Sequence, residues 1–401
     1  MDHPLEFSII IEHSAAGQEA LEFLQSLNLK CHIMTMFWES EWAELVKAAT
    51  YSVGPNVSQV AAPAVINLAA MNALAEFTPS EVASLGGAAV FLPAAWQTVK
   101  LANETQVWSI PWLADVRVVY YWRDLLEQAG VDDSSAFDTP DRFHATLQKL
   151  QAAGMNSPLL LLTHFPFAAL HYLSSWVWGA GEDFVNADGR SLRLNEPQFR
   201  AALRAYFSLQ RYLPTGTDSL TPTADGVSKA VDLFAKRQVA VAFGDPSWLR
   251  ATIEALRDTP LTIDRLGVAL PPGPPYVGGS NLVIWKHTRQ RDTAIRLIRS
   301  LISPDVQASF CQQVGLLPTR LEALQRPPYS TDPRYQVLAK AAQSGRSYPT
   351  LLRWGLIEEN LSRTLTQIWS DLAADPRRDL DGLFAQRIDP LATRLNNLLA
   401  Q

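Results

Sequence analysis

The sequence predicts an α/β protein built from two lobes. The chain has 401 residues, and because domains hold roughly 150 residues each, one hydrophobic core is too few. Apolar and polar positions alternate over 5–11, and apolar positions recur at helical spacing over 15–27, which is the pattern of a strand followed by a helix. A second apolar strand at 32–37, followed by a helix at 43–50, repeats this order.

The composition excludes several functional classes. Hydrophobic residues make up 47% of the chain and charged residues 18%, and no apolar run approaches the ~20 residues of a membrane span. The net charge is -6 and the Lys and Arg residues are scattered, which argues against a nucleic-acid partner because phosphates need a basic face. No metal-ligand cluster, Walker loop, dinucleotide fingerprint or nucleophile elbow is present. We therefore expect no metal and no cofactor.

The two cysteines, Cys31 and Cys311, fall on a predicted apolar strand and a predicted apolar helix. Two buried free thiols are favoured over a disulfide, which spacing alone does not establish.

The segment 266–320 contains the most informative series of predicted elements in the chain. It predicts a strand at 266–270, a Pro/Gly turn, a loop containing Gly278 and Gly279, an apolar strand at 282–285 and a helix from about 293. Ser303 and Pro304 then begin a second helix, since Ser favours the N-cap and Pro favours the first helical position.

Three stretches resemble one protein family in the same order along the chain. The motifs VGGSN, LVIWK, LISPDVQ and GLLPTR lie in segment 266–320, after VWSIPWLADVRVVYYWRDLLEQAGV and AVDLFAKRQVAVAFGDPSWL. Together they resemble the solute-binding proteins of ABC importers, in the maltose-binding-like branch. The resemblance implies a two-lobe, periplasmic-binding-protein-like fold of type II with a ligand cleft between the lobes. It places the first lobe at 1–112 plus 264–320, the second at 113–263 plus 321–401, and hinges near 111–116, 262–268 and 320.

One position departs from the family pattern in a way that has a physical cost. Arg237 stands where the family has a turn glycine, and this would cost about 1 kcal/mol if the position needs a positive φ.

The first candidate ligand residues follow predicted strands or helices. Trp38 and Glu39 come directly after the second strand, where ligands collect in α/β sheets. A core position for Trp38 and a favourable charge at a helix start for Glu39 are the alternatives. Trp112 and Asp115 fall at the first predicted crossing between lobes, although Asp115 and Arg117 lie on the same strand face and could simply pair.

Further candidates come from the two other family-like stretches. Trp178 stands near the end of a predicted helix and is an aromatic candidate for the cleft. Gly244 can bring the backbone close to a ligand, Asp245 is either a ligand acceptor or a helix cap, and Trp248 faces either the cleft or a lobe core. The loop of the segment 266–320 adds Gly278, Gly279, Ser280 and Asn281.

These residue types favour a binding protein for a small molecule. An aromatic face covers the apolar face of a pyranose, while Asp, Glu, Asn and backbone N–H groups bind its hydroxyls. We therefore expect a carbohydrate ligand rather than a polyol, a glycerol-phosphate-like compound or an amine. The resemblance implies capture by lobe closure and delivery to ABC permease subunits, and the protein is expected to be a monomer.

Two other functions stay open at this point. One keeps the binding fold but signals to a sensor kinase or another regulator. The other is a glycan-acting enzyme that uses paired carboxylates, with Glu39, Asp115, Asp183 and Asp245 as the available acids.

The family is usually exported, but MDHPLEFSIII shows no basic leader and no apolar core before a cleavage site. Either a leader has been removed, which implies the periplasm or cell surface, or this protein works in the cytoplasm.

Overall fold

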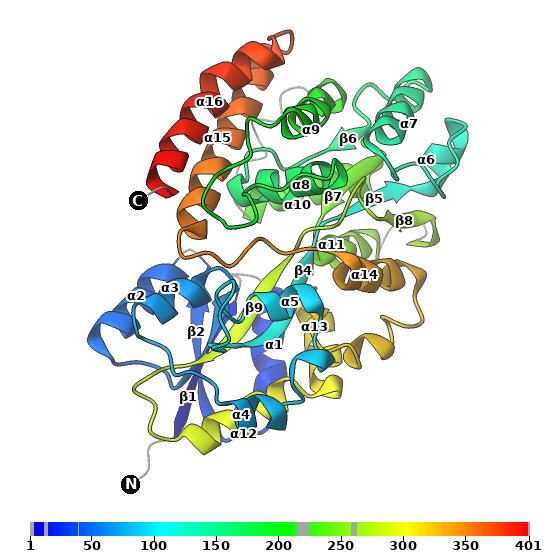
Figure 1. The fold of residues 1–401 in the computed structure, drawn as a ribbon. Coiled ribbons are helices and arrows are strands. Elements are labelled where there is room, and N and C mark those ends of the chain that lie inside the picture. Colours follow the sequence, from blue (N-terminus) through cyan, green and yellow to red (C-terminus); the bar gives the residue numbers. More distant parts are fainter. Residues whose placement is uncertain (1–3, 12–14, 39, 215–223, 258–262, 400–401) are drawn as a thin grey trace. The chain divides into compact units, whose positions relative to one another are not determined.

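The computed structural model describes residues 4–11, 15–38, 40–214, 224–257 and 263–399. Helices and strands are mixed along the chain, which divides into two compact units (Figure 1). Unit 1 contains Met1–Val116 and Val277–Gly355, and unit 2 contains Arg117–Tyr276 and Leu356–Gln401. The predicted α/β class with two lobes is confirmed.

Unit 1 is built on a six-stranded sheet in the order β10-β4-β9-β3-β1-β2. β1 pairs in parallel with β2 on one side and with β3 on the other. β9 pairs antiparallel with β3 and β4, and β10 pairs antiparallel with β4. The strands are β1 (Leu5–Ile11), β2 (Cys31–Phe37), β3 (Val57–Ala61), β4 (Ile110–Val116), β9 (Val277–Ile284) and β10 (Leu317–Pro318).

Helices pack on both faces of this sheet because its strands present apolar side chains alternately to either side. On one face, Ile10 packs with Leu45 of α2. On the other, Phe7 contacts Trp112, which stacks on Phe310 of α13. The helices of unit 1 are α1 (Ala15–Ser26), α2 (Glu41–Tyr51), α3 (Ala64–Ala70), α4 (Pro79–Ser84), α5 (Pro93–Gln97), α12 (Arg291–Leu301), α13 (Pro304–Val314) and α14 (Pro333–Ser344), with the 3₁₀ helices Ala88–Val90 and Ala323–Gln325.

Unit 2 is built on a four-stranded sheet in the order β6-β7-β5-β8. β6 pairs in parallel with β7, whereas β5 pairs antiparallel with β7 and with β8. The strands are β5 (Val118–Trp122), β6 (Leu159–Leu160), β7 (Val241–Gly244) and β8 (Leu266–Ala269). The helices are α6 (Arg123–Gln128), α7 (Pro140–Ala152), α8 (Pro166–Gly179), α9 (Pro197–Phe207), α10 (Ala224–Ala235), α11 (Pro246–Leu256), α15 (Trp354–Ala374), which begins in unit 1, and α16 (Leu380–Leu399), with the 3₁₀ helices Ser208–Tyr212 and Ile263–Arg265.

Aromatic side chains make much of the core of unit 2. Trp176 of α8 contacts Phe143, Tyr206 and Phe243, with ring centroids 5.4 to 5.7 Å apart. These rings come from α7, α9 and β7, so α8 is held against both the sheet and the neighbouring helices.

The observed unit boundaries differ from the predicted lobe boundaries. All of β4 lies in the sheet of unit 1, so this unit continues past the expected end at 112. Residues 264–276 belong to unit 2 because β8 pairs with β5. Residues 321–355 belong to unit 1, where the Val277 N–H donates to the Arg346 carbonyl (2.8 Å) and the Ser347 hydroxyl donates to the Val277 carbonyl (2.7 Å). The last crossing therefore falls after Gly355 rather than near Arg320.

Arg237 adopts the positive φ that the family's turn glycine would favour, with φ of 58°. Its guanidinium forms an ion pair with Asp124 and lies 4.6 Å from the ring centroid of Trp122. These contacts offset the backbone cost, which explains how an arginine is accommodated at this turn.

Three further properties concern membrane spans, metal ligands and thiols. No helix in the described ranges is long and apolar enough to cross a membrane. Within the same ranges, no group of three or more His, Cys, Asp or Glu side chains could hold a metal ion. Cys31 and Cys311 are both free thiols, with Cys311 buried and Cys31 only partly buried.

Candidate functional site

In unit 2, buried polar side chains gather around Arg117, which immediately precedes β5. Its backbone N–H donates to the carbonyl oxygen of Tyr276 (3.1 Å), and its Nη2 lies 3.2 Å from Nδ1 of His171. Its Nη1 forms a wide ion pair with Oδ2 of Asp245 at 3.9 Å. The Arg117 side chain is only 10% exposed, so these partners offset the cost of burying its charge.

His171 on α8 is held in its neutral form. Burial, and secondly the charge of Arg117, move the pKa of His171 well below its ordinary value near 6.5. A neutral imidazole accepts at one nitrogen and donates at the other. Because Nδ1 faces the guanidinium, Nε2 carries the hydrogen, and it lies 3.7 Å from Oε1 of Glu358 on α15. The ring is therefore oriented by a cation on one side and a carboxylate on the other.

Aromatic rings extend this cluster toward solvent. His171 stacks on Tyr276 with ring centroids 3.8 Å apart. Phe167, one turn earlier on α8, has its centroid 6.5 Å from that of His171 and is 55% exposed. Phe167 thus offers an accessible aromatic surface next to two buried rings.

Asp245 joins the cluster at the end of β7, where the strand turns sharply into α11. Gly244 permits this turn, because a Cβ there would lie 2.5 Å from the indole of Trp248. Oδ1 of Asp245 accepts from the Ser247 N–H (2.9 Å) and so caps α11, whereas Oδ2 faces Arg117. Since the Asp245 side chain is 32% exposed, one carboxylate oxygen can cap the helix while the other faces a ligand.

The chemistry of this cluster suits an uncharged, polyhydroxylated ligand. Phe167 supplies an aromatic face, and Asp245 supplies a partly exposed hydrogen-bond acceptor. The positive charge of Arg117 is balanced by Asp245 and Glu358, while His171 is neutral. Arg117, His171, Asp245 and Glu358 together therefore carry no net positive charge that would attract an anion.

In unit 1, Trp38 lies just beyond β2, as predicted, and is 46% exposed. It lines a small pocket of about 60 Å³ together with Ile11, Gln59, Leu113 and Phe310. Ile11 is the last residue of β1, so this pocket lies at the carboxyl end of parallel strands, where ligands are expected.

The predicted acids of unit 1 stay untested. Glu39 lies outside the described residues. Asp115 is half-buried in β4, directly opposite Gly278 of β9.

Two predicted ligand residues, Trp112 and Trp248, belong to the cores of their units. Trp112 is 0% exposed and stacks on Phe310, with centroids 5.0 Å apart and planes 9° apart. Trp248 is 2% exposed and packs edge-on against Phe234. We therefore correct the prediction that Trp112 contacts ligand, because it packs between Phe7 of the sheet and Phe310 of α13. Of the two alternatives for Trp248, the core position is the one observed.

Trp178 is also enclosed in this structure. It is 4% exposed, and its Nε1 donates to Oδ1 of Asp183 (3.2 Å). The prediction that Trp178 presents an aromatic face to a ligand is corrected accordingly, since its indole packs edge-on against Phe184.

The predicted Gly-Gly loop is part of strand β9, and its polar side chains form hydrogen bonds within unit 1. Asn281 is 2% exposed, and its Nδ2 donates to Thr98 Oγ1 (2.9 Å) and Ser109 Oγ (3.1 Å). Ser280 is 3% exposed and accepts from Gln59 Nε2 (2.9 Å). Buried polar groups need such partners, so the predicted ligand role of these two side chains is replaced by a structural one.

The two glycines differ in what they do. Gly279 has φ of +131°, and a Cβ there would lie 2.0 Å from the carbonyl oxygen of Leu113. It is required for the close approach of β9 to β4. Gly278 is half-buried, and its role toward a ligand stays a prediction.

Sequence reasoning missed Phe167, His171, Tyr276 and Glu358. Phe167 and His171 are four residues apart and so share one face of α8, which was a usable signal. Tyr276 and Glu358 join them only through the tertiary fold, because they come from distant parts of the chain.

Comparison with known proteins identifies the class to which this two-unit fold belongs. The family described as bacterial extracellular solute-binding protein matches residues 22–337. The chain belongs to this family.

Particular relatives are distant in sequence and close in fold. The diacetylchitobiose binding protein DasA of Streptomyces coelicolor is 25% identical over 296 residues, which cover 70% of this chain and 66% of DasA. The sugar-binding protein MalE from Xanthomonas citri aligns with a TM-score of 0.80 at 21% identity, over 99% of this chain and 97% of MalE. UgpB from Mycobacterium tuberculosis, solved in complex with glycerophosphocholine, aligns with a TM-score of 0.75 at 17% identity over 100% of both chains. One fold therefore serves proteins with different ligands.

Proposed function

We propose that this protein captures a sugar or a short oligosaccharide and presents it to an ABC permease. The observation that carries the proposal is the cluster in unit 2, where the exposed ring of Phe167 lies beside the His171–Tyr276 stack, Arg117 and Asp245. Such a combination covers the apolar face of a sugar ring and binds its hydroxyls. The names of DasA and MalE support the same ligand class.

The charge balance of the cluster favours a neutral sugar over a phosphodiester such as glycerophosphocholine, which UgpB was solved with. Arg117 is the cation of the cluster, and Asp245 and Glu358 already face the Arg117–His171 pair. A phosphate beside Arg117 would also be repelled by the carboxylates of Asp245 and Glu358.

A thermal-shift screen across sugars tests this proposal. Maltose, diacetylchitobiose, monosaccharides and glycerophosphocholine are each added in excess, since a bound ligand raises the melting temperature through RT ln(1 + [L]/Kd). We expect at least one sugar to raise the melting temperature, with calorimetry giving its Kd. A shift with glycerophosphocholine and none with any sugar would reverse the ligand assignment.

The family membership supports a binding role without chemistry on the ligand. Incubation with the identified sugar, followed by mass spectrometry, should recover it unchanged. Hydrolysis that disappears in Asp115→Asn or Asp245→Asn would instead support the carboxylate enzyme.

The family description also supports action outside the cytoplasm, in the periplasm or at the cell surface. Copurification of ABC permease subunits with the sugar-loaded protein supports delivery to a transporter. Copurification of a sensor kinase instead would favour the signalling alternative.

Closure of the two lobes about the ligand stays a prediction from the sequence. Enclosing a ligand couples binding to a domain movement when the closed form makes the additional contacts. Small-angle scattering with and without the identified sugar should show a smaller radius of gyration at saturation. Light scattering in the same experiments checks the expected monomer.

A further inference from the structure

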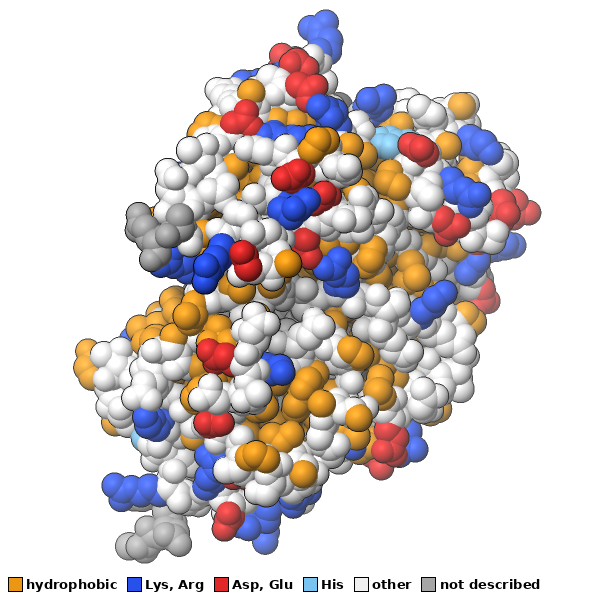
Figure 2. All heavy atoms as spheres, viewed as in Figure 1, with side chains coloured by type: hydrophobic (Ala, Val, Ile, Leu, Met, Phe, Trp, Pro, Cys, Tyr) orange, Lys and Arg blue, Asp and Glu red, His pale blue; other side chains and the backbone are white. Residues whose placement is uncertain are grey.

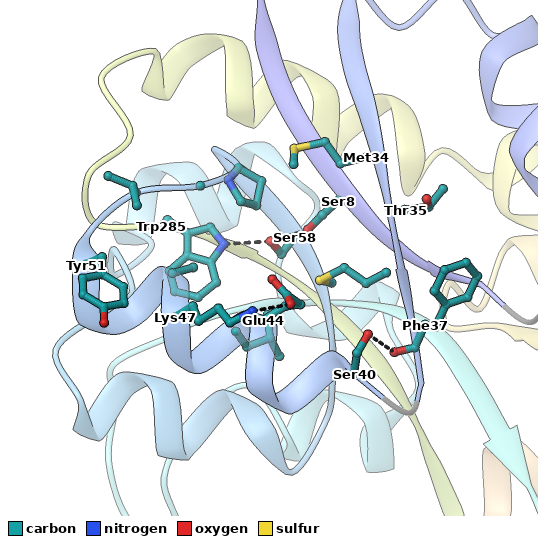
Figure 3. Close-up of a pocket in the computed structure, with 16 residues that line it drawn as sticks. Ser8, Met34, Thr35, Phe37, Ser40, Glu44, Lys47, Tyr51, Ser58 and Trp285 are labelled. Atoms are coloured by element: carbon teal, nitrogen blue, oxygen red, sulfur yellow. Dashed lines mark hydrogen bonds and ion pairs between the residues drawn. The ribbon is translucent and has the colours of Figure 1, made fainter.

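A second pocket lies in unit 1 between α2 and the sheet, and Figure 3 shows the residues that line it. Its volume is about 510 Å³, within the range of roughly 300–1,000 Å³ that is typical of small-molecule sites. The lining comes from β1, β2, β3, α2, the loop at 53–55 and Trp285. Every one of these segments belongs to unit 1.

The pocket exists because small side chains occupy one row of the sheet. Ser8 pairs with Met34 on one side and with Ser58 on the other, so these three side chains share a face. Two residues further along, Ile10 and Met36 stand on the same face and pack with α2 in the core. The serines do not reach α2 as Ile10 does, and space remains beneath the second half of this helix.

The floor of the pocket holds an unbalanced set of hydrogen-bonding groups. Nε1 of Trp285 donates to Oγ of Ser58 (2.7 Å; Figure 3), and the hydroxyl of Ser8 donates to the same oxygen (2.6 Å). Ser8 is 2% exposed and Ser58 is 0% exposed. Both of these hydrogen bonds end on Oγ of Ser58, so the hydroxyl hydrogen of Ser58 itself has no acceptor among the described residues. A buried donor of this kind favours a ligand that brings an acceptor.

The remaining walls are apolar and adaptable. Met34 and Met36 supply flexible thioethers, and Trp285 and Tyr51 supply aromatic surface. At the rim, Glu44 and Lys47 form an ion pair with each other at 2.7 Å. Their charges cancel, so neither sign of charge on a ligand is favoured.

The mouth of the pocket lies in an apolar part of the surface. Hydrophobic side chains gather on the α2 and α3 side of unit 1 (Figure 2). Among the lining residues, Met34 is 37% exposed, Tyr51 71% and Val53 64%. An apolar molecule would gain contacts at the mouth as well as inside.

We propose that this pocket binds a neutral, mostly apolar small molecule that carries one hydrogen-bond acceptor, of the kind represented by an aryl ketone. The body of the molecule packs against Met34, Met36 and the Trp285 ring, and its carbonyl oxygen accepts the hydroxyl hydrogen of Ser58. This site is separate in the chain from the residues proposed to bind sugar, and it does not depend on that function.

Two matched probes test the acceptor requirement on the full chain by fluorine NMR. 4-Fluoroacetophenone has the carbonyl, whereas 1-ethyl-4-fluorobenzene has nearly the same shape without it. We expect the ketone signal to broaden and saturate, and the ethyl compound to bind roughly fivefold more weakly, as one net hydrogen bond predicts. Equal affinities of the two probes would overturn the acceptor assignment, and no broadening by folded protein would overturn the pocket itself.

Two substitutions that fill the pocket test where the ketone binds. Ser8→Val adds volume on the floor and keeps the Trp285–Ser58 hydrogen bond. Met34→Phe fills the mouth from the edge strand and leaves both serines in the sequence. Each should weaken ketone binding at least tenfold while circular dichroism shows a folded protein. Met34→Phe alone decides the matter if Ser8→Val does not fold. Ketone binding that survives in folded Met34→Phe would overturn the proposal.

Phe167→Ala is the matched control in unit 2. It should leave ketone binding unchanged and should weaken the sugar response, whereas Ser8→Val should do the reverse. If Phe167→Ala abolishes ketone binding, the aromatic probe binds in the sugar site and the second pocket is refuted. Failure of every sugar to bind would leave the ketone result intact, so the two proposals are distinguishable.

Discussion

The imidazole of His171 and the phenol ring of Tyr276 stack with their centroids 3.8 Å apart and their planes 13° apart. His171 comes from α8 and Tyr276 is the residue before β9, so the stack ties a helix to the segment that leads into a strand far along the chain. Arg117 contacts both residues, through the His171 Nδ1 and the Tyr276 carbonyl. The three residues thereby form one connected part of the candidate site.

The depressed pKa of His171 predicts a pH dependence of stability. The folded state disfavours the imidazolium, so below the ordinary pKa near 6.5 the unfolded state binds more protons. The free energy of unfolding should therefore fall as the pH drops below about 6.5, by at most about 1.4 kcal/mol per pH unit for one group.

Urea unfolding between pH 5 and 8 measures this effect as the difference between wild type and His171→Gln. The pKa of His144 is also lowered, mainly by burial, but His144 is present in both proteins and cancels in the difference. The stabilities of the two proteins should change in parallel above pH 7 and diverge below pH 6.5. Identical slopes at acid pH would show that the folded state tolerates the charged imidazole.

Phe167→Ala should weaken sugar binding with little effect on stability. The ring is 55% exposed, so its removal opens no cavity and should change the free energy of unfolding by less than about 0.5 kcal/mol. Loss of an aromatic face against a sugar should cost roughly tenfold in Kd by calorimetry. Ile253→Ala on α11, which removes another exposed hydrophobic side chain of unit 2, is the matched control and should bind normally.

Asp245 allows the capping role and the ligand role to be separated. Asp245→Asn keeps a good N-cap but removes the charge that faces Arg117 at 3.9 Å, so it should lose less stability than a variant that also loses the cap. Asp245→Ala loses the bond to the Ser247 N–H and should lose about 1 kcal/mol of stability. If the carboxylate binds sugar hydroxyls, both variants should bind more weakly in calorimetry; normal affinity in both would leave Asp245 with the capping role alone.

Gly279→Ala should be strongly destabilising, because the new Cβ would meet the Leu113 carbonyl oxygen at 2.0 Å in a backbone with φ of +131°. Gly130→Ala is the matched control, since Gly130 has φ of +65° with nothing within 4 Å of an added methyl group. It should cost about 1 kcal/mol from the backbone alone. Denaturant unfolding of both variants separates the clash from the positive φ, and equal losses would argue against the close approach of β9 and β4.

Local sequence patterns were sufficient for several of the elements. The alternation over 5–11 corresponds to β1, and the Ser303–Pro304 signal corresponds to the start of α13. Asp245 was predicted either to cap the next helix or to bind ligand, and its capping bond is observed. Such features depend on neighbouring residues, which is why they are readable from the chain itself.

The sequence by itself determined the α/β class, the two-unit organisation and the family, because these are encoded in short motifs and periodicities. Only the tertiary structure decided which of the polar and aromatic residues are accessible. Trp112, Trp248 and Asn281 have the residue types of a sugar site, but they pack or hydrogen-bond inside the units. Phe167, in contrast, remains exposed next to His171 and Tyr276. Burial depends on contacts between segments that are distant in the chain. A tryptophan ring makes favourable apolar contacts in a core as well as with a ligand, so the residue type alone does not distinguish the two.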